Sequence, residues 1–199
     1  IVPGSQESSI PAGERDNEWH KSSDFTDIGG EDKAQTDLVY DTLTDLLVPQ
    51  NLMYRVDYTY NASYTSDSKV ATATYTDNEA GNETDPNYEY FEYASDGSMT
   101  LHVWKMDGSS IVPGNAEGTI PAGDLDNKWH KSSNFFTTTG GDLKAQRDEI
   151  YNDISMDDPA DLDRVEIYTY YADGTVHTKE IFDNTSLTQN ANYEKYTYD

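Results

Sequence analysis

The chain has 199 residues, with 38 Asp or Glu against 13 Lys or Arg, so its formal net charge at pH 7 is −25. This negative charge repels phosphate backbones and anionic lipids, which argues against nucleic-acid binding and peripheral membrane roles. Cysteine is absent, which excludes disulfides, thiolate metal sites and cysteine nucleophiles. No apolar run approaches the roughly 18 residues of a membrane-spanning helix, so we expect no membrane insertion. The 16 tyrosines indicate folded domains rather than a disordered acidic tail.

An internal repeat organises the chain. Residues 1–25 and 111–135 align without a gap and are identical at 17 of 25 positions. The match returns further on, where Arg55-Val56 aligns with Arg164-Val165. A period of about 110 residues is that of whole domains in tandem and is too long for a solenoid repeat. We therefore predict two domains, residues 1–110 and 111–199.

The predicted elements of each repeat begin with a polar lead segment, in which prolines exclude a regular helix. A helix is predicted next, over 31–48 in the first repeat and 142–155 in the second. Apolar residues at helical spacing support the two helices: Val39, Leu43, Leu46 and Leu47 in the first, and Leu143, Ile150, Tyr151 and Ile154 in the second. Gly-Gly before each segment and acidic residues after it are typical of a helix start.

Strands are predicted after each helix. In residues 54–64, tyrosine, valine and alanine alternate with polar residues at a period of two. Further strands are predicted over 69–76, 88–94 and 99–106, and over 164–171, 175–182 and 193–198. Asp96-Gly97 and Asp173-Gly174 are typical hairpin turns. The sequence thus predicts an α+β fold, each repeat having a polar lead segment, one helix and a three- to four-stranded antiparallel sheet.

The second repeat ends before any counterpart of the strand 99–106. Two interpretations remain open. Either the chain is part of a longer array, or the second sheet has an open edge, which is a template for pairing with another chain.

The segment Trp-His-Lys-Ser-Ser occurs in both repeats, beginning at Trp19 and at Trp129. One interpretation is an aromatic platform beside a titratable histidine, suited to sugar stacking or to general-base chemistry. The other is structural, because a tryptophan with a polar handle also anchors a segment on a sheet or in an interface. The sequence lacks the G-x-S-x-G pattern of a serine nucleophile and any H-x-x-x-H metal spacing.

Calcium is the only metal that the composition suggests, because hard cations prefer oxygen ligands. Four carboxylates cluster after the second predicted helix: Asp157, Asp158, Asp161 and Asp163. They do not fit a calcium-loop motif, so a solvated acidic surface is the alternative. Three sequons are candidate glycosylation positions if the chain is extracellular: Asn61, Asn82 and Asn184.

The repeat also predicts an assembly. Segment 111–135 lies between the two predicted bodies, where it is expected to dock, and segment 1–25 is its near copy with no preceding body in the sequence. A neighbouring molecule can supply that partner, which gives a head-to-tail homo-oligomer that forms a filament unless it closes. The expected docking residues of the first segment are Ile1, Val2, Ile10, Trp19 and His20, and their intramolecular equivalents are Ile111, Val112, Ile120, Trp129 and His130.

These patterns favour a non-enzymatic extracellular or cell-surface protein, structural or adhesive, that forms a head-to-tail filament or surface fibre. No cofactor is expected, apart from possible calcium. A secreted calcium- or carbohydrate-binding module is an alternative, and so is a pair of repeats excised from a long adhesin stalk.

Overall fold

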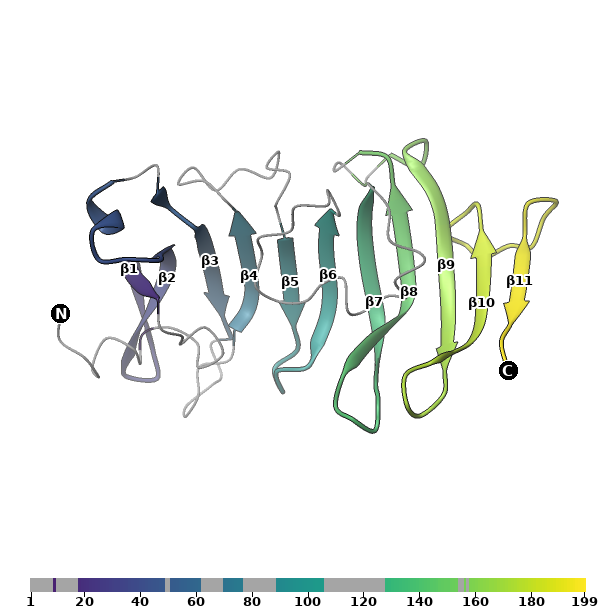
Figure 1. Cartoon of the computed structure of the whole chain (residues 1–199), viewed down its shortest axis with the longest axis horizontal. Coiled ribbons are helices and arrows are strands. Elements are labelled where there is room, and N and C mark those ends of the chain that lie inside the picture. Colours follow the sequence, from purple (N-terminus) through teal and green to yellow (C-terminus); the bar gives the residue numbers. More distant parts are fainter. Residues whose placement is uncertain are drawn as a thin grey trace. The chain divides into compact units, whose positions relative to one another are not determined.

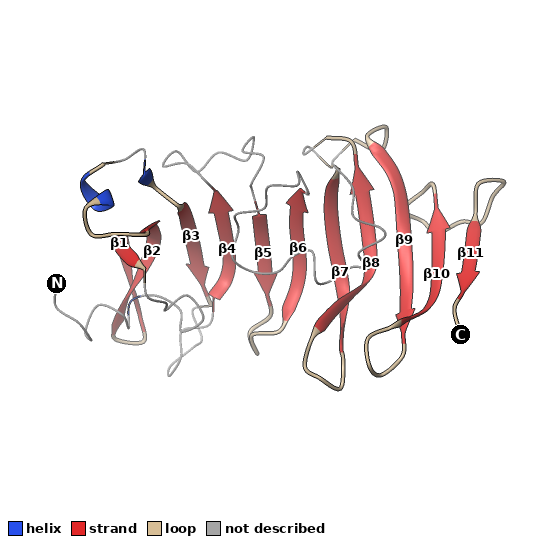
Figure 2. Cartoon of the chain, viewed as in Figure 1, coloured by secondary structure: helices blue, strands red, loops and turns tan. Residues whose placement is uncertain are grey.

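The computed structural model describes residues 9, 18–48, 51–61, 70–76, 89–105, 128–153, 156 and 158–199. These residues form antiparallel strands joined by turns, with a 3₁₀ turn at Asp45–Leu47 and no α-helix among them (Figure 2). In the described part of the chain, no helix is long and apolar enough to cross a membrane. The chain divides into two compact units, Ile1–Met99 and Thr100–Asp199.

The first unit is an antiparallel meander in which each strand pairs with the next (Figure 1). Its strands are β1 (Trp19–Ile28), β2 (Glu31–Tyr40), β3 (Tyr54–Tyr60), β4 (Val70–Thr76) and β5 (Glu89–Tyr93). The alternation predicted over 54–64 is confirmed within β3, where Tyr54, Val56 and Tyr58 are buried and the residues between them are more exposed. Its aromatic residues continue across the sheet, with the rings of Tyr54 and Tyr75 6.2 Å apart and those of Tyr75 and Phe91 5.5 Å apart.

The second unit is built in the same way. Its strands are β6 (Met99–Lys105), β7 (Trp129–Thr137), β8 (Leu143–Tyr151), β9 (Leu162–Tyr170), β10 (Val176–Phe182) and β11 (Glu194–Thr197). Almost all of β6 lies in this unit and pairs with β7, although the sequence repeat itself begins only at Ile111. Six predicted strands are confirmed to within about two residues at each end: 69–76, 88–94, 99–106, 164–171, 175–182 and 193–198.

The predicted α+β fold is wrong, because strands replace both helices. Residues 31–48 contain β2, and residues 142–155 contain β8. Gly29-Gly30, predicted to precede a helix, is instead the two-residue turn of the β1–β2 hairpin, with φ of 66° and 90°. Two consecutive residues with positive φ suit a hairpin turn of the type that matches strand twist. The partner strand is β1, and it includes residues 19–25, the end of the predicted polar lead segment.

The apolar spacing that suggested a helix does not form one face. Val39 is buried in β2, whereas Leu43 and Leu47 follow the strand and are 51% and 83% exposed. Within β2, buried residues lie on both faces, and three of them are polar or charged: Lys33, Thr36 and Asp37. In a strand that buries polar residues on both faces, apolar and polar residues do not alternate regularly. Its sequence therefore does not indicate a strand.

Two matching contacts relate β2 and β3 of the first unit to β8 and β9 of the second. The hydroxyl of Tyr60 donates to the Ala34 carbonyl over 2.5 Å, and that of Tyr170 donates to the Ala145 carbonyl over 2.7 Å. This correspondence gives Tyr60 and Tyr170 the same place. Counting back from them, Val56 corresponds to Glu166, so the sequence match of Arg55 with Arg164 is displaced by one residue.

An added side chain should destabilise the protein more at Gly174, in the Asp173-Gly174 turn, than at Gly141. Gly174 has φ of 89°, and a Cβ there would lie 2.7 Å from Cγ2 of Thr138. Gly141 has a similar φ of 94° but nothing within 4 Å of the same position. We expect Gly141→Ala to lower the free energy of unfolding by about 1 kcal/mol, from backbone strain alone. Gly174→Ala should cost about 2–4 kcal/mol because the clash adds to that strain. Urea unfolding of the two variants tests this, and equal losses would contradict it.

Candidate functional site

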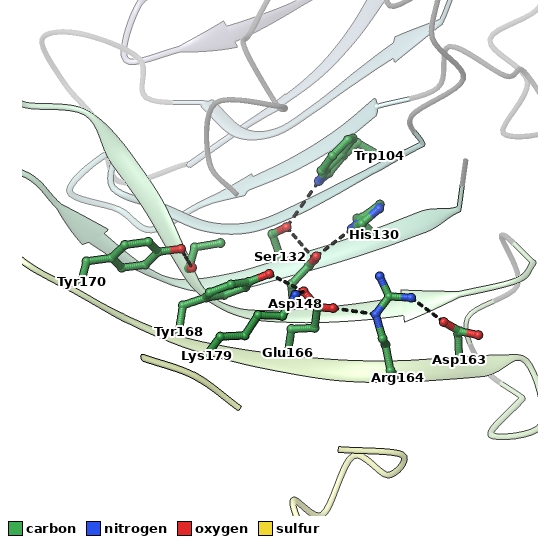
Figure 3. A network of polar contacts seen from close by, with 11 residues as sticks. Trp104, His130, Ser132, Asp148, Asp163, Arg164, Glu166, Tyr168, Tyr170 and Lys179 are labelled. Atoms are coloured by element: carbon green, nitrogen blue, oxygen red, sulfur yellow. Dashed lines mark hydrogen bonds and ion pairs between the residues drawn. The ribbon is translucent and has the colours of Figure 1, made fainter. Parts of the chain in front are cut away.

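A buried cluster of polar side chains lies on three adjacent strands of the second unit (Figure 3). His130 and Ser132 are two residues apart on β7, so their side chains share one face, and Ser132 lies opposite Asp148 on β8. The Nδ1 atom of His130 is 2.6 Å from Oδ2 of Asp148, and Oγ of Ser132 donates to Oδ1 of Asp148 over 2.9 Å. All three residues are fully buried. One carboxylate thus holds both an imidazole and a hydroxyl.

Trp104 on β6 completes this cluster. It lies opposite His130, and the two rings stack with centroids 4.4 Å apart and planes 16° from parallel. Its indole Nε1 donates to Oγ of Ser132 over 3.3 Å. The Ser132 hydroxyl therefore donates to the carboxylate and accepts from the indole, and Trp104 covers the imidazole.

The described residues of the first unit repeat the histidine, serine and aspartate of this cluster. Nδ1 of His20 is 2.5 Å from Oδ2 of Asp37, and Oγ of Ser22 donates to Oδ1 of Asp37 over 2.8 Å. The side chain of Asp37 is fully buried, but that of His20 is 16% exposed, whereas His130 is fully buried. Burial and the negative charge of Asp37 raise the pKa of Tyr60 above its ordinary value.

The chemistry of these clusters is that of anchoring. In a catalytic triad the serine hydroxyl gives its proton to an imidazole nitrogen, and a carboxylate holds the other nitrogen. Here the hydroxyl and the imidazole both bind the carboxylate, and Ser132 donates to Asp148 rather than to His130. The arrangement orients the histidine ring and satisfies a buried charge, but it does not activate the serine.

A second buried carboxylate, Glu166 on β9, lies beside this cluster and opposite Asp148. Its Oε1 accepts from Nε of Arg164 over 2.5 Å, and its Oε2 is 3.0 Å from Nζ of Lys179 and also accepts from the Tyr168 hydroxyl. Two cations and a hydroxyl thus compensate this charge. The corresponding residues of the first unit are apolar. Val56 takes the place of Glu166, because it lies opposite Asp37. Ala73 takes the place of Lys179, because it lies opposite Tyr58 as Lys179 lies opposite Tyr168.

The structure places four of the predicted docking residues within strands. Trp19 and His20 lie in β1, and Trp129 and His130 lie in β7. The other six lie outside the described residues: Ile1, Val2, Ile10, Ile111, Val112 and Ile120.

Three of the four predicted calcium ligands are described, and calcium binding at them stays a prediction. Asp157 lies outside the described residues, and Asp158 accepts from the backbone N–H of Ala160 over 2.8 Å. Asp163 lies 2.5 Å from Nζ of Lys128 and 2.6 Å from Nη1 of Arg164. Burial opposes its ionisation, but these two cations outweigh burial and lower the pKa of Asp163. Within the described ranges, no group of three or more histidines and carboxylates could hold a metal ion.

Two of the three sequon asparagines are described. The amide of Asn61 is 3.5 Å from the Val70 carbonyl. The amide of Asn184 donates to Oδ1 of Asp183 and to the Thr188 carbonyl, which stabilise a turn. Asn82 lies outside the described residues. A glycan on Asn184 would have to replace these amide contacts.

Pattern analysis selected the histidines of the clusters but missed their partners. The missing signal was present in the repeat, because Asp37 and Asp148 align when Lys33-Ala34-Gln35 is matched to Lys144-Ala145-Gln146. Trp104 has no aligned counterpart in this sequence, so only the strand register reveals its role.

Comparison with known proteins identifies no counterpart of these clusters. No protein-family model, no curated protein and no solved structure matches the chain.

Proposed function

We propose that this chain is a non-enzymatic, extracellular structural or adhesive protein that assembles head to tail through segment 1–25. The supporting observation is a difference between two identical pentapeptides. Trp-His-Lys-Ser-Ser forms the start of both β1 and β7, and each of its five residues is more exposed in β1 than in β7. In β7 this pentapeptide is covered by β6. Among the described strands, β1 pairs with β2 alone, and a strand at the end of a sheet is suited to receive another chain.

The residue types on β1 support docking by apolar burial. Phe25, in the same strand, is 53% exposed, although fully burying an aromatic side chain of this size is worth roughly 1.5–3 kcal/mol. The polar clusters also support a structural role, because they anchor the strands that carry Trp19 and Trp129.

Charge at Phe25 should prevent this assembly. We expect Phe25→Glu to abolish the rise of molar mass with concentration that light scattering should show for the unaltered chain. Leu47→Glu is the matched control, because it adds the same charge at an exposed apolar residue outside β1. If both variants assemble like the unaltered chain, or if the unaltered chain remains monomeric, the proposal is wrong.

Assembly should also depend on salt. Each molecule carries a net charge of −25, so neighbours repel one another. The Debye length grows from about 3 Å at 1 M salt to about 30 Å at 0.01 M. We expect light scattering to show dissociation as sodium chloride is lowered over this range. A chelator added at constant ionic strength separates this screening from specific calcium binding, and loss of assembly on chelation alone would favour calcium.

A carbohydrate-binding role is a second candidate, favoured by exposed aromatic rings at the end of the second unit. Tyr171, Tyr196 and Tyr198 are each more than two-fifths exposed. The Tyr171 ring lies 4.7 Å from that of His177, and its hydroxyl donates to the Tyr198 carbonyl. Saturable binding of an immobilised glycan that is lost in Tyr198→Ala but retained in Phe25→Glu would favour this role over assembly.

A further inference from the structure

We propose that the outer edge of β11 pairs with the same edge of a second copy of this chain, in an antiparallel register that charge selects. The inference goes beyond the proposed function, because it concerns the second unit and a contact between two identical surfaces. A two-fold contact of this kind closes at two molecules, whereas head-to-tail docking propagates.

The strand β11 is exposed along its whole length. Among the described strands it pairs with β10 alone (Figure 1). All four of its residues are exposed, and Tyr198, just beyond its end, is 44% exposed. An exposed edge of a sheet is a template on which another strand can pair.

The backbone contacts of β11 show which residues face this edge. The N–H of Tyr198 donates to the His177 carbonyl over 2.9 Å, so Tyr198 directs its backbone groups toward β10. Successive residues of an antiparallel strand alternate in direction, and Tyr196 therefore faces β10 as well. Lys195 and Thr197 direct their N–H and carbonyl groups to the outer edge, and an added strand would extend this alternation to Asp199.

The edge lacks the features that usually block pairing. Proteins protect exposed edges with proline, with bulges or with lysines that reach past the strand. The segment 194–199 contains no proline, and the pairing of β11 with β10 has no register shift. Its lysine is turned inward, because Nζ of Lys195 lies 2.6 Å from Oε1 of Glu180 on β10. The lysine charge therefore lies over the sheet and leaves the edge clear.

Opposite charges select one register for the second copy. Residues that face the outer edge pair with one another across the two-fold axis. If Thr197 lies opposite Thr197, Lys195 lies opposite Asp199 on both sides of the axis. If Lys195 lies opposite Lys195, like charges meet, which is destabilising. The register between these two, with Lys195 opposite Thr197, joins no opposite charges.

The register centred on Thr197 also pairs aromatic side chains. It places Tyr196 opposite Tyr198 twice, on the face of the sheet that Lys195 and Asp199 do not use. These are the pairs without backbone hydrogen bonds, in which side chains lie closest. Both tyrosines are 44% exposed in the single chain, so pairing removes aromatic surface from water.

Amide NMR spectra recorded over a range of concentrations test this pairing. Contacts limited to one short strand bury little surface and are weak, so we expect a midpoint at roughly millimolar concentration. The Phe25→Glu variant is used, so that assembly through segment 1–25 does not interfere. The amide signals of Lys195, Thr197 and Asp199 should shift together, with one midpoint. Signals that stay fixed up to several times that concentration overturn the inference.

Two matched variants of Thr197, made in the Phe25→Glu chain, test strand addition. Thr197→Pro removes an outward N–H from each copy, and edge strands tolerate proline on the side that faces solvent. The loss of two hydrogen bonds should raise the midpoint about tenfold or more. Thr197→Val keeps the N–H and the branched shape and should leave the midpoint unchanged. The amide of Tyr198 should stay protected from hydrogen exchange in both variants, and equal midpoints would overturn the inference.

A charge reversal at Asp199, made in the same chain, tests the register. Asp199→Lys places lysines opposite one another at both ends of the contact and should raise the midpoint about fivefold or more. Asp142→Lys makes the same change at an exposed residue outside β11. It should lower the midpoint slightly, because it reduces the net charge of −25 through which two copies repel. A midpoint that Asp199→Lys lowers or leaves unchanged overturns the inference.

The outcome is separate from that of the proposed function. Pairing through β11 is too weak to contribute to light scattering at micromolar concentration, where assembly through segment 1–25 is measured. Assembly there without the β11 shifts leaves the proposed function standing and overturns the inference. The β11 shifts in a chain that stays monomeric at micromolar concentration support the inference and contradict the proposed function.

Discussion

Replacement of Asp148 by alanine is expected to lower the free energy of unfolding by about 3–5 kcal/mol. The change removes the acceptor that Nδ1 of His130 and Oγ of Ser132 share in a fully buried site. Both polar groups would then stay buried with their shared interaction lost. Urea unfolding followed by tryptophan fluorescence measures the loss, since Trp104 and Trp129 lie in the same unit.

Two comparisons make this expectation specific. Asp142→Ala removes an exposed carboxylate just before β8 and should change stability by less than about 0.5 kcal/mol. Asp37→Ala should cost less than Asp148→Ala because His20 is partly exposed to water. A loss below about 1 kcal/mol for Asp148→Ala would show that the cluster contributes little to stability.

Glu166→Val should be similarly destabilising, by about 3–5 kcal/mol, because it removes the carboxylate that Lys179 and Arg164 share. The double variant Glu166→Val/Lys179→Ala should recover most of this loss. It reproduces the apolar pair of the first unit, where Val56 and Ala73 occupy the corresponding positions. Replacing a buried ion pair by apolar residues is often neutral, whereas removal of one partner is costly.

A double-mutant cycle of urea unfolding measures this coupling. The expected signature is an interaction energy of about 2 kcal/mol or more between positions 166 and 179. The conservative variant Glu166→Gln separates charge from shape, because it retains an acceptor for the Tyr168 hydroxyl. If the double variant loses as much as the sum of the two single variants, the pair is not coupled.

Much of the strand content was predictable from local pattern, because one face of β3 is aromatic and the other is polar. The Asp-Gly turns were predictable for a similar reason: Gly97 and Gly174 both have positive φ, which glycine adopts at little cost. The helices were wrongly predicted because Gly-Gly is ambiguous without its partner strand. In β2 the burial of Thr36 and Asp37 removed the alternation that would have identified a strand.

The clusters could be predicted only in part. Their histidines stand in a repeated segment, but Asp37 lies 17 residues from His20, a separation that no local motif specifies. The match of Arg55 with Arg164 pointed to the wrong correspondence by one position. A register shift between Ile150 and Tyr151 in the β8–β9 pairing accompanies this displacement, and such shifts depend on the paired strands rather than on either sequence alone.

The difference between Val56 and Glu166 also bears on how two similar repeats avoid exchanging strands while they fold. If β9 took the place of β3, the Glu166 carboxylate would be buried against Asp37. Ala73 would stand where Lys179 normally balances that charge. Two adjacent buried carboxylates with one cation fewer make this mispaired sheet costly. The buried charge thus distinguishes one repeat from the other and opposes the strand exchange to which tandem repeats are prone.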